Sequence, residues 1–206
     1  MNYQIVSKIP KEKGRVQICL DNGVTFDIYK GEAYKLSLFE KSKLNEEQYQ
    51  QILTEIIGKR ATKYAMHLLE RQERTEKQLR DKLTQQEYPA MCIEQAIEYV
   101  KSYHYVDDYR YACTYVRYHQ EKESRQKLQL KLAMRGVDRE VIRQALEEEY
   151  VSDESVRIEE LLRKRHFNAE TADETEYRKT VQFLMRKGFR SQDIYKVIKG
   201  YEECWS

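Results

Sequence analysis

The feature that most constrains this chain is a helix-turn-helix pattern that occurs three times. The first copy comprises Leu83, Tyr88, Ile93 and Ile97. The second, 49 residues later, comprises Leu132, Val137, Ile142 and Leu146, and the third, 52 residues further on, comprises Leu184, Phe189, Ile194 and Ile198. A unit of this size buries its apolar face poorly by itself, so neighbouring copies are expected to stack. The pattern predicts a mainly α fold of three tandem three-helix repeats in an elongated, curved array.

The composition of the chain agrees with a helical protein that has no membrane segment. Only seven glycines and two prolines interrupt 206 residues, which favours long helices over a turn-rich β fold. No apolar run approaches the roughly 18 residues that span a bilayer, and the N-terminus lacks the pattern of an export signal. We therefore expect a soluble protein of the cytoplasm. The four cysteines, Cys19, Cys92, Cys113 and Cys204, have no metal-ligand spacing, so reduced thiols and no metal or cofactor are expected.

The first 58 residues differ from the rest in hydrophobic period. Two stretches around Ile18 and Phe26 alternate apolar and polar residues, and Asp21-Asn22-Gly23 between them is typical of a hairpin turn. Asn45, followed three residues later by Gln48, indicates a helix start, and Gly58 is expected to end that helix. Residues 1–58 are predicted to form a small β-hairpin plus helix extension.

From residue 59 onward every break in the pattern resembles a helix joint. The expected helix caps are Thr75, Ser124, Asp138 and Ser191, with Pro89 at a first helical position and Gly136 and Gly188 at helix ends. These signals place repeat 1 at residues 59–104, repeat 2 at 105–151 and repeat 3 at 152–206. The prediction is nine helices after Gly58 and strands only before it.

Basic charge concentrates in the first and middle helices of the repeats. Residues 59–82 hold eight basic and four acidic side chains, residues 117–143 hold the same numbers, and residues 144–156 hold five acidic and no basic ones. A recurrent excess of this kind suits contact with nucleic acid or an acidic protein surface. The candidate binding residues are Arg71, Arg74, Lys77, Arg80, Arg117, Arg125, Lys127, Lys131, Arg135, Arg163, Lys164, Arg165, Arg186 and Lys187.

Within repeat 2 three of these cations form a stripe. Lys127, Lys131 and Arg135 recur every four residues beside the apolar pair Leu128 and Leu132. Like charges at this spacing cost helix stability, which indicates that the stripe meets an anion or an acidic surface. The alternative is a solvated helix face.

No catalytic constellation is recognisable. Asp107-Asp108 suits a helix start better than an acid/base or metal pair, the histidines lack ligand spacing, and Gly58-Lys59 lacks the rest of a phosphate loop. The chain is therefore expected not to be an enzyme. Six tyrosines could stack on nucleic-acid bases, but their helical spacing favours core and inter-repeat packing. They are Tyr103, Tyr105, Tyr109, Tyr111, Tyr115 and Tyr118.

Three segments resemble the RecX family of bacterial recombinase regulators. The stretch 105–112 with Tyr115-Val116-Arg117 is similar to the family signature around paired aspartates, residues 128–137 to its leucine-spaced element ending in Gly-[IV], and residues 78–83 to a looser copy of that element. The resemblance covers about residues 59–202. Departures are His104 at the signature glycine, Gln120–Glu123 in place of a more basic loop, and Tyr88-Pro89 at the first joint.

The resemblance implies a monomeric, non-enzymatic protein that binds the RecA recombinase. Such a protein lodges in the groove of the RecA filament on single-stranded DNA and lowers its ATPase, strand-exchange and coprotease activities in DNA repair and the SOS response. Weak, non-specific binding of nucleic acid is compatible with the basic helices. Two other classes stay open: a helix-turn-helix DNA-binding protein, which would carry one basic reading helix, and a general helical interaction scaffold.

Overall fold

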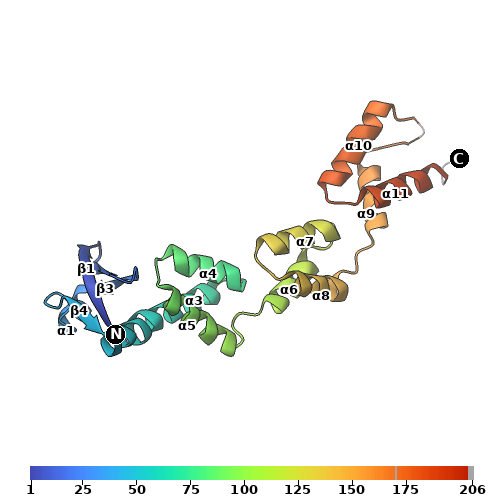
Figure 1. The fold of residues 1–206 in the computed structure, drawn as a ribbon. Helices are drawn as coiled ribbons and strands as arrows, with labels where there is room; N and C mark the ends of the chain where they lie inside the picture. The colour runs from blue at the N-terminus through green and yellow to red at the C-terminus, as the bar shows by residue number, and fades with distance from the viewer. Residues whose placement is uncertain (170, 204–206) are drawn as a thin grey trace. The chain divides into compact units, whose positions relative to one another are not determined.

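The protein is described by a computed structural model that covers residues 1–169 and 171–203, with side chains through residue 200. The chain divides into two compact units, one of residues 1–107 and one from residue 108 onward. Figure 1 labels elements of each unit and colours them by their position in the chain. Among the described residues, the first unit contains the four strands and the first group of three helices, and the second unit contains the other two groups.

The N-terminal strands form one antiparallel sheet. Its strands are β1 (Asn2–Pro10), β2 (Arg15–Leu20), β3 (Thr25–Tyr29) and β4 (Lys43–Asn45), in the order β3-β2-β1-β4. The predicted hairpin is confirmed, because β2 pairs with β3 and Gly23 supplies the positive φ of +81° in the turn. Strand β4 and the short helix α1 (Lys30–Lys35) were not predicted, because they lie in a stretch without a clear hydrophobic period.

Gly58 does not end a helix, and the prediction that it does was wrong. Helix α2 (Glu46–Gln51), which Asn45 caps as predicted, continues through a π-helical segment, η1 (Ile52–Gly58), into α3 (Lys59–Arg71). The wide turns leave the carbonyls of Leu53 and Thr54 open to side chains of the helix that packs across them. Cys92 Sγ lies 3.2 Å from the first carbonyl and Gln95 Nε2 donates to the second at 3.2 Å.

Glycine is needed at position 58 for a close approach. A Cβ there would lie 2.0 Å from Gln95 Oε1 and 2.9 Å from the Leu53 carbonyl oxygen. The backbone of Gly58 is itself helical, with φ of −63°. The residue therefore permits packing between two helices instead of stopping one.

Nine helices follow Gly58 in the described chain, and no described residue after it is in a strand, as predicted. Repeat 1 comprises α3, α4 (Glu76–Gln85) and α5 (Ala90–Ser102). Repeat 2 comprises α6 (Asp108–His119), α7 (Arg125–Met134) and α8 (Arg139–Glu149). Repeat 3 comprises α9 (Glu154–Lys164), α10 (Glu174–Arg186) and α11 (Ser191–Glu203).

Most predicted helix starts are confirmed by hydrogen bonds. The side chains of Thr75, Ser124 and Asp138 accept from backbone amides at the starts of α4, α7 and α8. Two predictions are displaced by one residue. Pro89 precedes α5 as its N-cap, and Ser191 is the first residue of α11 instead of its cap.

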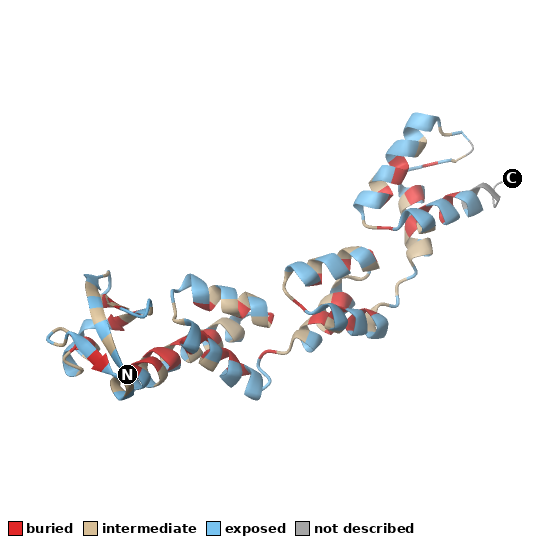
Figure 2. Cartoon of the chain, viewed as in Figure 1, coloured by how far each residue is buried: buried red, intermediate tan, exposed pale blue. Residues whose placement is uncertain are grey.

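The repeated apolar positions form the cores. Leu83, Leu132 and Leu184 are fully buried, and each belongs to a separate cluster of buried side chains. Figure 2 shows buried segments on the helices of each group, alternating with exposed ones. The first cluster also includes the sheet and η1, so the N-terminal extension and repeat 1 share one core.

The tyrosines of the signature region do not fill the core as predicted. Tyr111 and Tyr115 pack partly buried against the second cluster, as expected. The other four, Tyr103, Tyr105, Tyr109 and Tyr118, are between 37% and 75% exposed. Tyr103 and Tyr105 lie in the joint before α6, and Tyr109 and Tyr118 are exposed residues of α6.

Candidate functional site

Two of the four cations predicted in repeat 1 are paired with carboxylates of the same repeat. Lys77 lies 2.8 Å from Asp81, one turn along α4. Arg80 contacts Glu76 and also Glu94 of α5, and these hydrogen bonds raise the guanidinium pKa. The two remaining candidates differ: Arg71 is exposed at the end of α3, whereas Arg74 has its Nε buried with no hydrogen-bond partner in the described chain.

In repeat 2 two predicted cations connect helices instead of facing a partner. Arg117 of α6 donates its Nε to Glu149 of α8 at 2.9 Å. Arg125, the first residue of α7, donates to the Leu146 carbonyl at 3.2 Å and lies over the Tyr150 ring. These contacts connect α6 and α7 to α8, and the Arg117 side chain is still 60% exposed.

The predicted cationic stripe of α7 is divided between internal and external roles. Lys131 forms an ion pair with Glu123, in the loop before α7, whose side chain is only 14% exposed. Arg135 lies 4.5 Å above the Tyr115 ring and donates to the Lys131 carbonyl. Lys127 makes no such side-chain ion pair among the described residues and lines a groove described below.

In repeat 3 the predicted cations gather around Phe183 or extend from the surface. Arg165 lies 4.5 Å from the centroid of the Phe183 ring and Lys187 lies 5.6 Å from it. Arg163 and Lys164, at the end of α9, are exposed. Arg186 is also exposed, and it lines the same groove as Lys127.

This groove, which we call the α7–α10 groove, has a volume of about 590 Å³. It lies between α7 and the end of α10, within the second unit. It is lined by Gln126, Lys127, Gln129, Leu130, Ala133, Met185, Arg186 and Gly188. Its charged lining residues are both cations. Leu130 is 61% exposed, and the neighbouring Met134 is 74% exposed, so the floor and edge offer apolar surface beside positive charge.

A hydrogen bond between repeats 2 and 3 holds the two walls of the groove together. Ser124 Oγ donates to the Gly188 carbonyl at 2.7 Å and accepts from the Lys127 amide at 3.3 Å. Gly188 has a φ of +92°, and a Cβ there would lie 2.4 Å from Ser124 Oγ. The predicted helix-ending glycine therefore also allows the end of α10 to touch the start of α7.

Further contacts fix the same junction. Arg157 of α9 donates to the Glu123 carbonyl at 2.7 Å and lies over the Phe189 ring. Glu154 accepts from the Arg125 amide at 2.7 Å. The α7–α10 groove is thus a supported surface rather than a gap between loosely joined helices.

Sequence reasoning missed the groove but could have found one of its walls. Leu130 and Met134 are four residues apart, and each lies two residues beyond a buried leucine of α7. Two residues correspond to about 200° around a helix, so these side chains form a second apolar stripe opposite the core. The opposite wall, formed by Met185, Arg186 and Gly188, could not be predicted, because these residues are more than 50 positions from α7 in the sequence.

The other motifs behave as simple structural features. Asp108 begins α6, as expected for a helix start. His104, at the glycine position of the signature, has a φ of +55°, the conformation for which glycine is preferred. Burial raises the pKa of the Cys92 thiol to about 12, and Cys19 and Cys113 are also free thiols, whereas Cys204 lies outside the described residues. Among the described residues no cluster suits a metal ion, and no helix could cross a membrane.

Comparison with known proteins identifies the class to which this fold belongs. Three family models match in order: the first three-helix domain of RecX at residues 61–99, the second at 107–146 and the third at 153–198. These matches cover more than half of the chain. The chain therefore belongs to the RecX family of regulatory proteins.

Curated relatives and solved structures agree. The regulatory protein RecX of Caldanaerobacter subterraneus is 29% identical over 92% of this chain and 95% of its own length. That of Clostridium acetobutylicum is 28% identical over 97% of both chains. A crystal structure of regulatory protein RecX aligns over 96% of this chain and 99% of its own, with a TM-score of 0.61 and 24% identity. RecX from Lactobacillus salivarius aligns over 71% of this chain with a TM-score of 0.58.

Proposed function

We propose that this regulatory protein acts in the cytoplasm by binding the RecA recombinase and its filament on single-stranded DNA, and that it lowers RecA activity without catalysing a reaction. Family membership carries the proposal, because all three RecX domains are present in order. The arrangement of the cations supports it. Acidic protein surface and DNA phosphate are the two anionic surfaces of such a filament that basic helices can meet.

The α7–α10 groove is the surface that suits this contact best. Lys127 and Arg186 supply positive charge, and Leu130 and Met185 supply apolar area beside it. Protein interfaces gain most of their affinity from a few apolar or aromatic anchors, whereas charge complementarity sets the partner and the association rate. An acidic segment with one or two large apolar side chains fits this combination.

Inhibition would follow from contact with more than one RecA subunit. A protein with three tandem domains can make several modest contacts, and linked contacts strengthen one another because the second is intramolecular. A molecule that bridges neighbouring subunits obstructs filament growth and the entry of duplex DNA. Substoichiometric amounts should therefore lower strand exchange.

Co-sedimentation with RecA filaments tests the contact surface. We expect Lys127→Glu combined with Arg186→Glu to lower the co-sedimented fraction, because each side chain is at the groove and its removal breaks no internal ion pair among the described residues. Lys196→Glu combined with Lys199→Glu on α11 is the matched control, since both lysines are exposed and the change in net charge is the same. Equal loss in both variants would mean that overall charge, and not the groove, determines binding.

Variants of Lys131 and Arg135, the other two cations of the predicted stripe, cannot be interpreted in the same way as variants of Lys127. Reversal of charge at Lys131 or Arg135 removes the contacts with Glu123 and Tyr115, so these variants change the packing of repeat 2 as well as its surface. If these variants bind the RecA filament less well, the loss does not show that Lys131 or Arg135 contacts RecA. Variants of Lys127 separate the two effects.

A further inference from the structure

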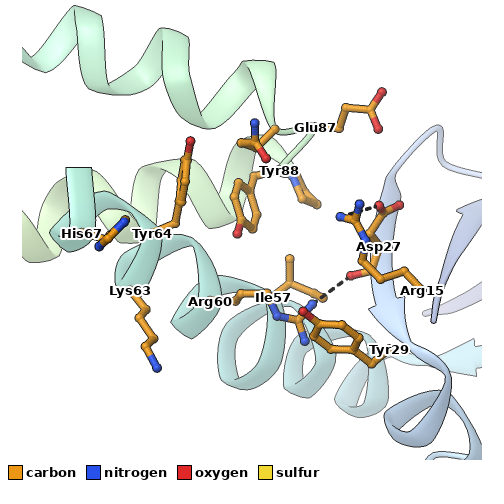
Figure 3. Close-up of a pocket in the computed structure, with 12 residues that line it drawn as sticks. Arg15, Asp27, Tyr29, Ile57, Arg60, Lys63, Tyr64, His67, Glu87 and Tyr88 are labelled. Atoms are coloured by element: carbon orange, nitrogen blue, oxygen red, sulfur yellow. Dashed lines mark hydrogen bonds and ion pairs between the residues drawn. The ribbon is translucent and has the colours of Figure 1, made fainter. Parts of the chain in front are cut away.

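A second cavity lies in the first unit, between the sheet and repeat 1. Its volume is about 350 Å³, and it is lined by side chains from β2, β3, η1, α3 and the joint between α4 and α5. Figure 3 shows the arrangement: Tyr64 and Tyr88 lie beside one another, Arg60 lies over Tyr29, and Arg15 faces Asp27. The proposed contact with RecA does not use this cavity, which we call the sheet–helix pocket.

One guanidinium group in the pocket is held rigidly. Arg60 of α3 donates to the Asp27 carbonyl at 3.1 Å and to the Glu32 carboxylate at 2.8 Å. Its guanidinium carbon lies 4.8 Å from the centroid of the Tyr29 ring. A cation fixed in this way loses little conformational freedom when it binds an anion, which favours recognition.

The charges around the pocket leave a small positive excess. Four cations, Lys11, Arg15, Arg60 and Lys63, meet three carboxylates, those of Asp27, Glu32 and Glu87. Asp27 is close to both Arg15 and Lys11, at 3.2 and 3.4 Å. One positive charge remains, which matches the single negative charge of one phosphodiester.

The opposite wall of the pocket is aromatic. The ring centroids of Tyr64 and Tyr88 are 6.2 Å apart, and the rings are tilted by 36°. Burial raises the pKa of the Tyr88 hydroxyl, so this group remains protonated and can donate a hydrogen bond. Aromatic faces beside fixed cations are the usual elements of single-strand nucleic-acid sites, because every base can stack on a ring.

The joint that presents Tyr88 breaks a local rule that the other two repeats obey. Glu87 has a φ of +59°, whereas the equivalent positions in repeats 2 and 3 are Gly136 and Gly188, at +83° and +92°. A left-handed backbone is disfavoured for a residue with a Cβ. The Glu87 carboxylate lies 2.5 Å from Lys11 Nζ, in the loop after β1, and so ties the joint to the sheet across the pocket. Strain of this kind often accompanies a functional site.

We propose that the sheet–helix pocket binds one nucleotide of a single-stranded nucleic acid. The base stacks on the Tyr64–Tyr88 wall, and the phosphate lies near Arg60, with Arg15 and Lys63 on either side of the pocket (Figure 3). The pocket volume is of the size found for small-ligand sites, about 300–1,000 Å³. An acidic peptide would satisfy the charge but would leave the two rings without a planar partner, so a nucleotide uses more of the pocket.

Photocrosslinking locates the bound base directly. The probe is a ten-residue deoxythymidine strand that contains one photoreactive 5-iododeoxyuridine, and crosslinked peptides of the full-length protein are mapped by mass spectrometry. We expect crosslinks at Tyr64 or Tyr88. Crosslinks confined to other parts of the chain would overturn the proposal.

Affinities of the same strand for variants give an independent test. Tyr64→Leu keeps an apolar side chain but removes the aromatic face, and it should weaken binding about tenfold, the scale of one stacked base. Lys63→Glu should weaken binding several-fold, because Lys63 is exposed at the rim. Lys43→Glu is the matched control, since Lys43 is exposed on β4, at the opposite edge of the sheet from β3. Circular dichroism checks that each variant is folded.

Competitors separate the possible sources of the ligand. Unlabelled deoxythymidine strand should remove the crosslink at micromolar concentration, and deoxythymidine monophosphate should do so only at a much higher one, because a strand adds backbone contacts outside the pocket. A glutamate- and tyrosine-containing peptide that removes the crosslink more effectively than the strand would assign the pocket to an acidic protein partner and overturn the proposal. Unchanged affinity in both Tyr64→Leu and Lys63→Glu would also overturn it.

Discussion

Replacement of Ser124 by alanine tests how repeats 2 and 3 are joined. The hydroxyl is completely buried, caps α7 through the Lys127 amide and donates to the Gly188 carbonyl. Loss of an N-cap costs about 1 kcal/mol. Loss of the second hydrogen bond, which leaves a partly buried carbonyl without this donor, costs about 1 kcal/mol more. Ser124→Ala should therefore lower the free energy of unfolding by about 2 kcal/mol.

The matched control is another helix cap, whose side-chain hydrogen bond lies within repeat 2. The Asp138 carboxylate accepts from the Glu140 amide at the start of α8. Asp138→Ala should cost about 1 kcal/mol, the cap alone. Urea unfolding measures both losses, and hydrogen exchange locates them: Ser124→Ala should increase exchange in α7 and at the end of α10, whereas Asp138→Ala should increase it in α8.

A double-mutant cycle separates the bond between repeats from the cap. Gly188→Ala is strained by its positive φ and by the 2.4 Å approach of the new Cβ to Ser124 Oγ. Removal of the hydroxyl relieves the second effect, so Gly188→Ala should cost less in the Ser124→Ala background than in the wild-type protein. Additive losses, together with unchanged exchange at the end of α10, would refute the claim that Ser124 couples the repeats.

Three other predictions concern the first unit and nucleic acid. Gly58→Ala should destabilise the protein by about 1–2 kcal/mol in urea unfolding, because the new Cβ would lie 2.9 Å from the backbone carbonyl oxygen of Leu53 and would also displace the Gln95 side chain. Gly200→Ala, with open space around it, should stabilise by about 0.5–1 kcal/mol; a loss at Gly200 that equals the loss at Gly58 would contradict this explanation. For Glu76, burial raises the pKa, but hydrogen bonds from Lys101 and Arg80 lower it more, so the pKa lies below its ordinary 4.5. The stabilisation that Glu76 gains from Lys101 and Arg80 is therefore present above about pH 4.5 and is lost as the pH falls below that value. In Glu76→Gln, the free energy of unfolding should depend less on pH in this range. Single-stranded DNA should bind weakly and without sequence preference, with a log–log salt dependence of about 0.7 per phosphate neutralised; salt-insensitive binding, or tight preference for one duplex sequence, would favour a different class of protein.

The three-helix repeats were predictable because their information is local. Each apolar set repeats at helical spacing, and each joint has a cap or a left-handed glycine within a few residues. Such a pattern specifies which face of a helix is buried without knowledge of its partner. Local pattern gave the wrong role for Gly58, because the glycine makes room for the side chain of Gln95, which is 37 residues away in the sequence. A glycine that ends a helix and one that admits a neighbour look alike in sequence.

The proposed binding surface was less predictable, because the pairing of charges depends on residues far apart in the sequence. The sequence shows Lys131 as one of a stripe of three cations, but not that the loop before α7 returns Glu123 to it. It likewise cannot show that Lys127 and Arg186, which are 59 residues apart, line one groove. The sheet–helix pocket depends on a still less visible feature: Glu87 occupies a position where the other repeats have glycine.

An ATPase titration of the cognate RecA on single-stranded DNA tests the central proposal most directly. We expect the 206-residue protein to lower ATP hydrolysis at molar ratios well below one per RecA subunit. The variant with Lys127→Glu and Arg186→Glu should require a higher ratio for the same effect, whereas the Lys196→Glu and Lys199→Glu control should act like the parent. Unchanged hydrolysis at equimolar protein, with no co-sedimentation on the filament, would contradict the proposed function.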